Sequence, residues 1–161
     1  LTAMNKQQQA LLNIGINGNV RSRTMNDKDR QLWRVFNVLF YVTPNWKLEN
    51  GGNLEIWPKG LENQPIEITS KFNRLVIMAT HQKSWHSVNQ VLADDVRCCV
   101  SNYYFSEKPL LLDDNFHITT FRGRPTEKFR DFILKLDNNF RSGLRRIFRK
   151  GIRENPHQYK K

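Results

Sequence analysis

The residues whose types could support chemistry are concentrated in the second half of the chain. The four histidines, none of which precedes residue 81, are His81, His86, His117 and His157. His86 lies inside an expected strand, and Arg97 follows eleven residues later in the next apolar segment. An arginine on a mostly buried strand needs a carboxylate or another anion as its partner. From the residues alone, that partner is either a structural Asp or Glu or a bound anion.

The other candidates indicate packing. His81 and His86 are five residues apart, which places them on opposite faces of a strand and argues against a shared metal. His117 alternates with apolar residues, a pattern typical of a core or edge histidine. Cys98 and Cys99 are adjacent, so they cannot easily bridge each other. We expect them to be packing residues of a protein in a reducing, cytoplasmic compartment.

The segments that must position these residues are short and apolar, with turn residues between them. Residues 33–42 (WRVFNVLFYV) are nearly continuous in apolarity, which favours a strand buried on both faces. Shorter strands are expected at 53–57, 66–68, 74–80, 84–92, 96–105 and 117–121. Residues 10–16 are apolar enough for a strand or a short helix. Strands at this spacing, without intervening helices, indicate a sandwich, jelly roll or barrel.

The hydrophobic period changes after Pro125. Apolar residues then recur at three- and four-residue steps, at Phe129, Phe132, Ile133, Leu136, Phe140, Leu144, Ile147 and Phe148. This pattern predicts an amphipathic helix that begins near Pro125 and stops at Gly151, with its apolar stripe docked on the sheet as core. The chain therefore divides into a body, residues 1–124, and a C-terminal helical segment, residues 125–161.

Charge is distributed unevenly between these two parts. The 161 residues contain 26 Lys or Arg and 15 Asp or Glu, a net charge of +11, and residues 125–161 contribute +7 of it. Such a basic segment allows nucleic-acid or anion binding as an alternative function, although a solvated helix face is the simpler interpretation. No run approaches the roughly 18 apolar residues of a membrane span, so we expect no membrane partner. The chain begins with Leu1, and we expect an N-terminally truncated domain.

Several segments together resemble a known enzyme family. Residues 34–41 (RVFNVLFY), the turn and strand 51–57 (GGNLEIW), residues 84–87 (SWHS) and 97–104 (RCCVSNYY) follow in the order found in the prolyl 4-hydroxylase-like iron(II)/2-oxoglutarate oxygenases. Residues 116–125 (FHITTFRGRP) resemble the end of a bacterial and phage subgroup. The resemblance covers about residues 30–125 and implies a double-stranded β-helix, or jelly roll, with the C-terminal amphipathic helix added.

The resemblance assigns roles to three residues. His86 matches the distal histidine of the family's iron site, and Arg97 matches the basic residue that binds the distal carboxylate of 2-oxoglutarate. Tyr41 matches a tyrosine whose hydroxyl also contacts this cosubstrate. We therefore expect Arg97 to point into the fold with Tyr41 close by. The implied cofactors are iron(II) and 2-oxoglutarate, with ascorbate as an open addition.

One family motif is not found. An H-x-D should lie about a dozen residues before Arg34, where the chain reads NVRSRT over residues 19–24. Arginine cannot ligate iron, and no histidine precedes Asp27 or Asp29. Three explanations are open. The start of the domain is truncated or altered, so that the motif is absent from this chain; or the protein is a degenerate family member that binds an anion without iron; or a non-standard residue replaces the missing iron ligands.

The function expected from the sequence is 2-oxoglutarate- and iron-dependent hydroxylation of an unidentified peptidyl or small-molecule substrate. The alternatives are a degenerate, non-catalytic jelly-roll protein and a basic nucleic-acid or anion-binding module. Because the H-x-D is not found, we expect this chain alone to bind iron weakly.

Overall fold

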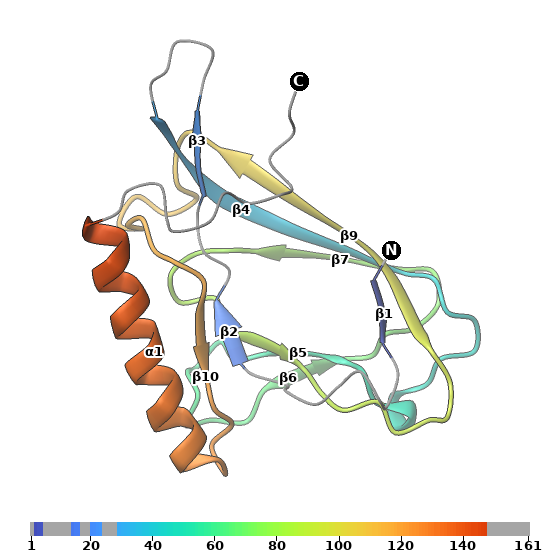
Figure 1. Ribbon diagram of the computed structural model, residues 1–161. Helices are drawn as coiled ribbons and strands as arrows, with labels where there is room; N and C mark the ends of the chain where they lie inside the picture. The colour runs from blue at the N-terminus through green and yellow to red at the C-terminus, as the bar shows by residue number, and fades with distance from the viewer. Residues whose placement is uncertain (1, 5–13, 17–19, 24–28, 148–161) are drawn as a thin grey trace.

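The structure is a computed structural model that describes residues 2–4, 14–16, 20–23 and 29–147 (Figure 1). Within these residues the chain is mainly β, with two five-stranded antiparallel sheets and one long helix. No helix in these ranges is long and apolar enough to cross a membrane.

The first sheet is built around one long strand. Its order is β1-β9-β4-β3, and β7 also pairs with β4, on the β3 side. The strands are β1 (Thr2–Met4), β3 (Val20–Arg23), β4 (Asp29–Tyr41), β7 (Arg74–Ala79) and β9 (Arg97–Ser106). The length of β4 lets β3 pair with its beginning and β7 with its end.

The second sheet consists of three-residue strands in the order β10-β2-β8-β5-β6. They are β2 (Ile14–Ile16), β5 (Leu54–Ile56), β6 (Ile66–Ile68), β8 (His86–Val88) and β10 (Thr120–Arg122). All seven strands expected between residues 33 and 121 are present, with bounds that differ by a few residues. The sequence did not predict β1 or β3, which are short and carry little apolar pattern.

The chain passes back and forth between the two sheets. After β4 in the first sheet it forms β5 and β6 in the second, returns for β7, crosses for β8 and returns for β9. Figure 1 shows the sheets as two layers. Apolar core side chains with 5% exposure or less include Tyr41, Leu54, Met78 and Cys99.

The outer face of the first sheet differs from the expectation of a strand buried on both faces. Phe36 on β4 is 37% exposed, and the neighbouring strands expose Leu75, Ile77, Val100 and Tyr104. Within the described ranges, no helix covers this face, because the long helix contacts β10 at the edge of the other sheet. The prediction of two buried faces was therefore wrong for the described structure.

Helix α1 (Lys128–Ile147) forms where the hydrophobic period predicted it. Its anchor is polar: Asp131 accepts hydrogen bonds from Arg122 and from the Gly123 amide, and Asn138 bonds both backbone groups of Phe121. Residues 148–161, with the expected stop at Gly151, lie outside the described residues. The division between residues 124 and 125 stays a prediction.

The apolar stripe of α1 is not core, contrary to the sequence-based expectation. Phe129 is 78% exposed and Phe140 is 66% exposed, and Phe132, Ile133 and Leu136 are also exposed. The reason is that the face with Asp131 and Asn138 satisfies the backbone of residues 121–123, so the helix packs through that face. Periodicity shows that a helix has two faces but does not show which one packs.

Candidate functional site

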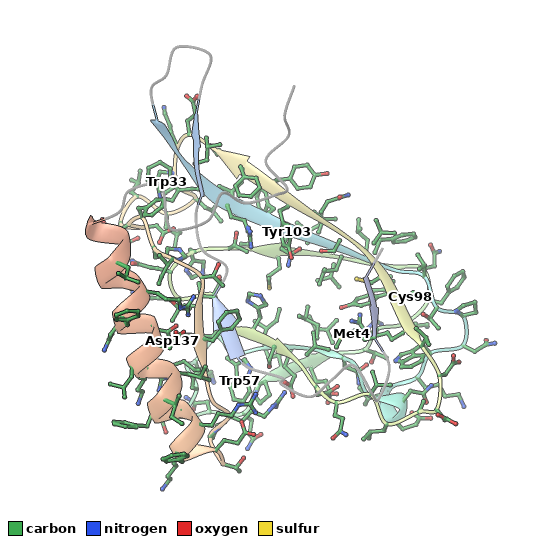
Figure 2. All side chains as sticks on the ribbon, viewed as in Figure 1. Met4, Trp33, Trp57, Cys98, Tyr103 and Asp137 are labelled. Carbon is green, nitrogen blue, oxygen red and sulfur yellow. The ribbon has the colours of Figure 1, made fainter. Side chains whose placement is uncertain are left out.

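Arg97 opens β9 and lies in the interior, with 3% of its surface exposed. Its Nε is buried and has no hydrogen-bond partner, and its Nη2 contacts the sulfur of Met4. Figure 2 labels Met4 on β1. A thioether is a weak acceptor and carries no charge. Arg97 forms no ion pair with any carboxylate in the described ranges. A buried guanidinium in this state is expected to bind an anion.

Tyr41, at the end of β4, lies beside Arg97. The guanidinium carbon of Arg97 is 5.5 Å from the centroid of the Tyr41 ring, and Tyr41 is only 1% exposed. Burial raises the pKa of the Tyr41 hydroxyl, against the opposing effects of its hydrogen bond with Ser70 and the charge of Arg97. The hydroxyl therefore stays protonated and can act as a hydrogen-bond donor.

A glycine turn lets the backbone approach this arginine. Gly51 and Gly52 have φ values of 70° and 65°, a region that favours glycine. A Cβ on Gly52 would lie 3.0 Å from Cδ and 3.2 Å from Nε of Arg97. Ser70, the partner of Tyr41, donates to the Gly52 carbonyl at 2.8 Å. Arg97, Tyr41, Ser70 and Gly52 thus form one contiguous cluster, which we call the arginine cradle.

Asn53 fixes the turn that carries the arginine cradle. Its side chain is fully buried, donates to the Leu48 carbonyl and Glu67, and accepts from the Ser70 amide. Its backbone amide donates to the side chain of Asn89. Four polar contacts at one buried asparagine explain why residues 51–53 keep their conformation.

His86 begins β8 in the second sheet. Its neighbour Ser87 points to the opposite face, where it donates to Glu55. The Nδ1 of His86 lies 2.9 Å from the Ser84 carbonyl, so a neutral ring donates from Nδ1 and leaves Nε2 unprotonated. Burial lowers the pKa of His86, against the opposing effect of its hydrogen bond with the Ser84 carbonyl, and the charge of Arg34 also lowers it. A neutral imidazole held by such a carbonyl bond suits a metal ligand.

The strand that carries His86 is fixed from its other face. Glu55 on β5 is buried, accepts from Ser87 at 2.5 Å and forms an ion pair with Arg124 at 2.7 Å. Arg124 also donates to the Val88 carbonyl. These bonds join β5, β8 and the segment before α1, so the position of His86 depends on all three.

Arg34 is a second arginine on the first sheet, half-buried, which the sequence did not single out. The pairing of β4 with β9 shifts between Arg34 and Phe36, and this bulge places Arg34 opposite Phe105 on the face that carries Tyr103. The guanidinium carbon of Arg34 lies 4.0 Å from the Tyr103 ring centroid and 5.5 Å from that of Phe105. Arg97 was identified because it is a charged residue on an apolar strand, and the same criterion would have identified Arg34.

The iron expected from the family does not fit the described residues. The segment where the H-x-D was sought contains β3, whose backbone pairs with the beginning of β4, while Asn19, Thr24 and Asp27 lie outside the described residues. No group of three His, Cys, Asp or Glu side chains that could hold a metal occurs in the ranges that the structure describes. Of the expected set, only His86 is present there.

The remaining candidates serve local structure. His81 accepts from the Lys83 amide in a turn, and Cys98 and Cys99 are free thiols, one half-buried and one buried. Trp46 and Trp57 are buried and donate to Gly51 and Ser87.

The basic segment is only partly described. Arg141 pairs with Asp137 and donates to the Thr119 carbonyl. The basic residues of this segment that lie outside the described residues are Arg149, Lys150, Arg153, Lys160 and Lys161. The described part therefore leaves the nucleic-acid alternative as a prediction.

Comparison with known proteins identifies the family of the chain. The profile of the 2OG-Fe(II) oxygenase superfamily matches residues 18–105, more than half of the chain, from before β3 to the end of β9. No curated protein matches the chain. Members of this superfamily in general use iron(II) and 2-oxoglutarate, and the match suggests a dioxygenase function for the chain. The chain belongs to the 2OG-Fe(II) oxygenase superfamily.

Proposed function

We propose that this chain binds 2-oxoglutarate in its interior, with the distal carboxylate on Arg97 and Tyr41, as the cosubstrate of a hydroxylation. The observation that carries the proposal is the buried Arg97 guanidinium, whose Nε has no partner and which forms no ion pair within the described ranges. A guanidinium presents a fork of donors that matches a carboxylate. The bound anion would remove the cost of this buried charge.

The jelly-roll assignment belongs to this proposal. It is supported by two antiparallel sheets, by the repeated crossing of the chain between them and by the family match. Two consecutive strands then lie in opposite sheets: β8, which contains His86, and β9, which contains Arg97. We also propose the prolyl 4-hydroxylase-like family, supported by the ordered segments between residues 34 and 104, and its bacterial and phage subgroup, supported by the ending FHITTFRGRP at residues 116–125. Peptidyl and small-molecule substrates both remain open.

The residues of the arginine cradle divide the binding task. Arg97 supplies the charge, and Tyr41, kept protonated by its raised pKa, exchanges its hydrogen bond with Ser70 for one donated to the same carboxylate. Gly52 leaves the room that a side chain would take beside Arg97. His86 lies on β8 in the opposite sheet, with its Nδ1 held by the Ser84 carbonyl. Because the described residues lack a full iron site, turnover requires ligands from outside them.

A second candidate function follows from the missing ligands. A degenerate member of the family would keep the Arg97 site and bind a dicarboxylate without iron. The observation in its favour is that arginines occupy positions 21 and 23 where the H-x-D was sought. Both functions share the carboxylate site and differ in metal binding and turnover.

Thermal unfolding in rising 2-oxoglutarate tests the shared claim. A ligand that binds only the folded state, present at 100 times its Kd, stabilises by about 2.7 kcal/mol. We expect the Tm of the wild-type chain to rise with 2-oxoglutarate and to rise much less with 2-oxobutyrate, which lacks the distal carboxylate. Arg97→Gln should abolish the effect, and Arg130→Gln on α1 should preserve it. An equal response of Arg97→Gln and the wild type would refute the site.

A further inference from the structure

Helix α1 has an exposed apolar face. Its members are Phe129, Phe132, Ile133, Leu136 and Phe140, each about half exposed or more. They recur at three- and four-residue steps, so they form one continuous stripe along the helix. We call this stripe the phenylalanine face. Exposed apolar stripes of this kind mark interaction sites in soluble proteins.

The anchoring of α1 fixes the direction of this face. Asp131, Asn138 and Arg141 lie on the other side of the helix and bond to residues 119–123. Turning the helix to bury the phenylalanine face would break these bonds. Figure 1 shows α1 at the outer edge of the molecule, alongside β10, with its far side directed away from both sheets. The phenylalanine face can therefore meet a flat surface along its length.

The charges around α1 select the kind of surface. The acidic residues near its start and middle are paired within the chain: Glu127 with Arg130, Asp131 with Arg122 and Lys135, and Asp137 with Arg141. Residues 125–147 nevertheless contain six Lys or Arg and three Asp or Glu, a net charge of +3. A surface that covers the phenylalanine face therefore meets an excess of positive charge.

We propose that α1 binds the surface of an anionic lipid bilayer, with the phenylalanine face inserted at the level of the headgroups. Helices with Phe and Leu on one face and Lys and Arg around it lie in this interface. The cytoplasmic leaflet carries the complementary negative charge. This proposal replaces the expectation of no membrane partner, which rested on the absence of a spanning segment.

Two other occupants agree less well with these observations. A second copy of the chain would bring the same net charge of +11 against the first. A nucleic acid would attract the basic residues through its phosphates, but it would leave Phe129, Phe132 and Leu136 in water. The bilayer satisfies both the apolar and the basic part of the helix.

Vesicle co-sedimentation tests the proposal on the full chain. The probes are vesicles of phosphatidylcholine alone and vesicles of equal parts phosphatidylcholine and phosphatidylglycerol. We expect binding to the second kind only, weakened by added salt. Phe132→Gln/Leu136→Gln, at two exposed positions, should reduce binding about tenfold or more, because apolar burial contributes to the partition. Asn139→Gln, at an exposed polar position of the same helix, should bind as the wild type does.

Three results would overturn the proposal. The first is an absence of binding to the anionic vesicles by the folded wild-type chain. The second is equal binding by the double variant, with far-ultraviolet circular dichroism showing that α1 is still formed. The third is an oligomer in light scattering that Phe132→Gln/Leu136→Gln dissociates while no vesicle binding occurs, which would assign the face to a second copy.

Discussion

At the scale of single residues, Arg97 is the proposed binding group for the distal carboxylate of 2-oxoglutarate. We expect the same buried side chain to lower the stability of the ligand-free protein. Its buried Nε has no partner, and an unsatisfied buried donor costs about 1–3 kcal/mol. Arg97→Met keeps a long side chain, removes the charge and can pack against Met4. We expect the free energy of unfolding of the ligand-free variant to rise by about 1–3 kcal/mol, measured in urea. A loss of similar size would show that Arg97 has an internal partner and would contradict the binding claim.

Gly52 gives a second test at this scale. Alanine there would have its Cβ 2.8 Å from Cγ2 of Val91 and 3.0 Å from Cδ of Arg97, at a φ of 65°. We expect Gly52→Ala to lose about 1–2 kcal/mol of stability from the left-handed backbone alone, and to weaken 2-oxoglutarate binding because Arg97 must move. Calorimetric titration measures the affinity.

Gly60→Ala is the matched control for Gly52→Ala. Gly60 has a φ of 84°, but a Cβ there meets nothing within 4 Å. The control should lose stability through the same backbone cost and bind 2-oxoglutarate normally. Equal affinity of both variants for 2-oxoglutarate would show that Gly52 does not contribute to the binding site.

The sequence predicted some of these residues and not others for a physical reason. Arg97 could be identified because a charge on an apolar strand demands a partner. Arg34 carries the same signal, but the bulge that places it on the face of Tyr103 depends on pairing with β9, which is distant in the sequence. The contacts of Ser70 with Tyr41 and Gly52 likewise join three separate segments.

At the scale of elements, the attachment of α1 depends on Asp131. Its carboxylate accepts from Arg122 at 2.6 and 2.9 Å and from the Gly123 amide at 3.0 Å. Hydrogen bonding by Arg122 holds the pKa of Asp131 well below its usual range. We expect Asp131→Asn to cost about 1.5–3 kcal/mol at neutral pH, as for hydrogen bonds to charged groups. Urea unfolding followed by circular dichroism measures it.

The pH dependence of this effect has a definite sign. The folded-state pKa of Asp131 is lowered, so the unfolded chain takes up the proton first, and the stabilisation is lost as pH falls from about 4. The difference between the wild type and Asp131→Asn should therefore narrow below that pH. Asp137→Asn, which breaks the more exposed pair with Arg141, should cost only about 0.3–0.5 kcal/mol. Equal costs for both variants would show that Asp131 is no special anchor.

The elements themselves were largely predictable, because strands and helices leave different periods in the sequence. Strands β4, β7 and β9 coincide closely with apolar segments, and α1 coincides with a 3.6-residue period. The face of α1 that packs was not predictable. It is set by partners of Asp131 and Asn138 on residues 121–123, and no pattern within the helix encodes them.

At the scale of the whole molecule, family membership and the described residues disagree over iron. The superfamily uses iron(II), yet of the expected ligands only His86 is present in the described ranges. We therefore expect an anaerobic iron(II) titration of the chain to show weak binding that His86→Ala barely changes, since such sites depend on several ligands acting together. Tight stoichiometric binding that His86→Ala abolishes would instead reveal further ligands, with Asp27, which lies outside those ranges, and Asp29, at the start of β4, the first to test.

The central claim, that a dicarboxylate binds at Arg97, is tested most directly by a crystal structure of the chain with 2-oxoglutarate. The claim predicts the distal carboxylate within hydrogen-bond distance of the Arg97 guanidinium and the Tyr41 hydroxyl, between the two sheets. The same position should be filled whether or not iron(II) is added. A ligand bound elsewhere, or an Arg97 guanidinium paired with a carboxylate of the chain itself, would contradict the claim.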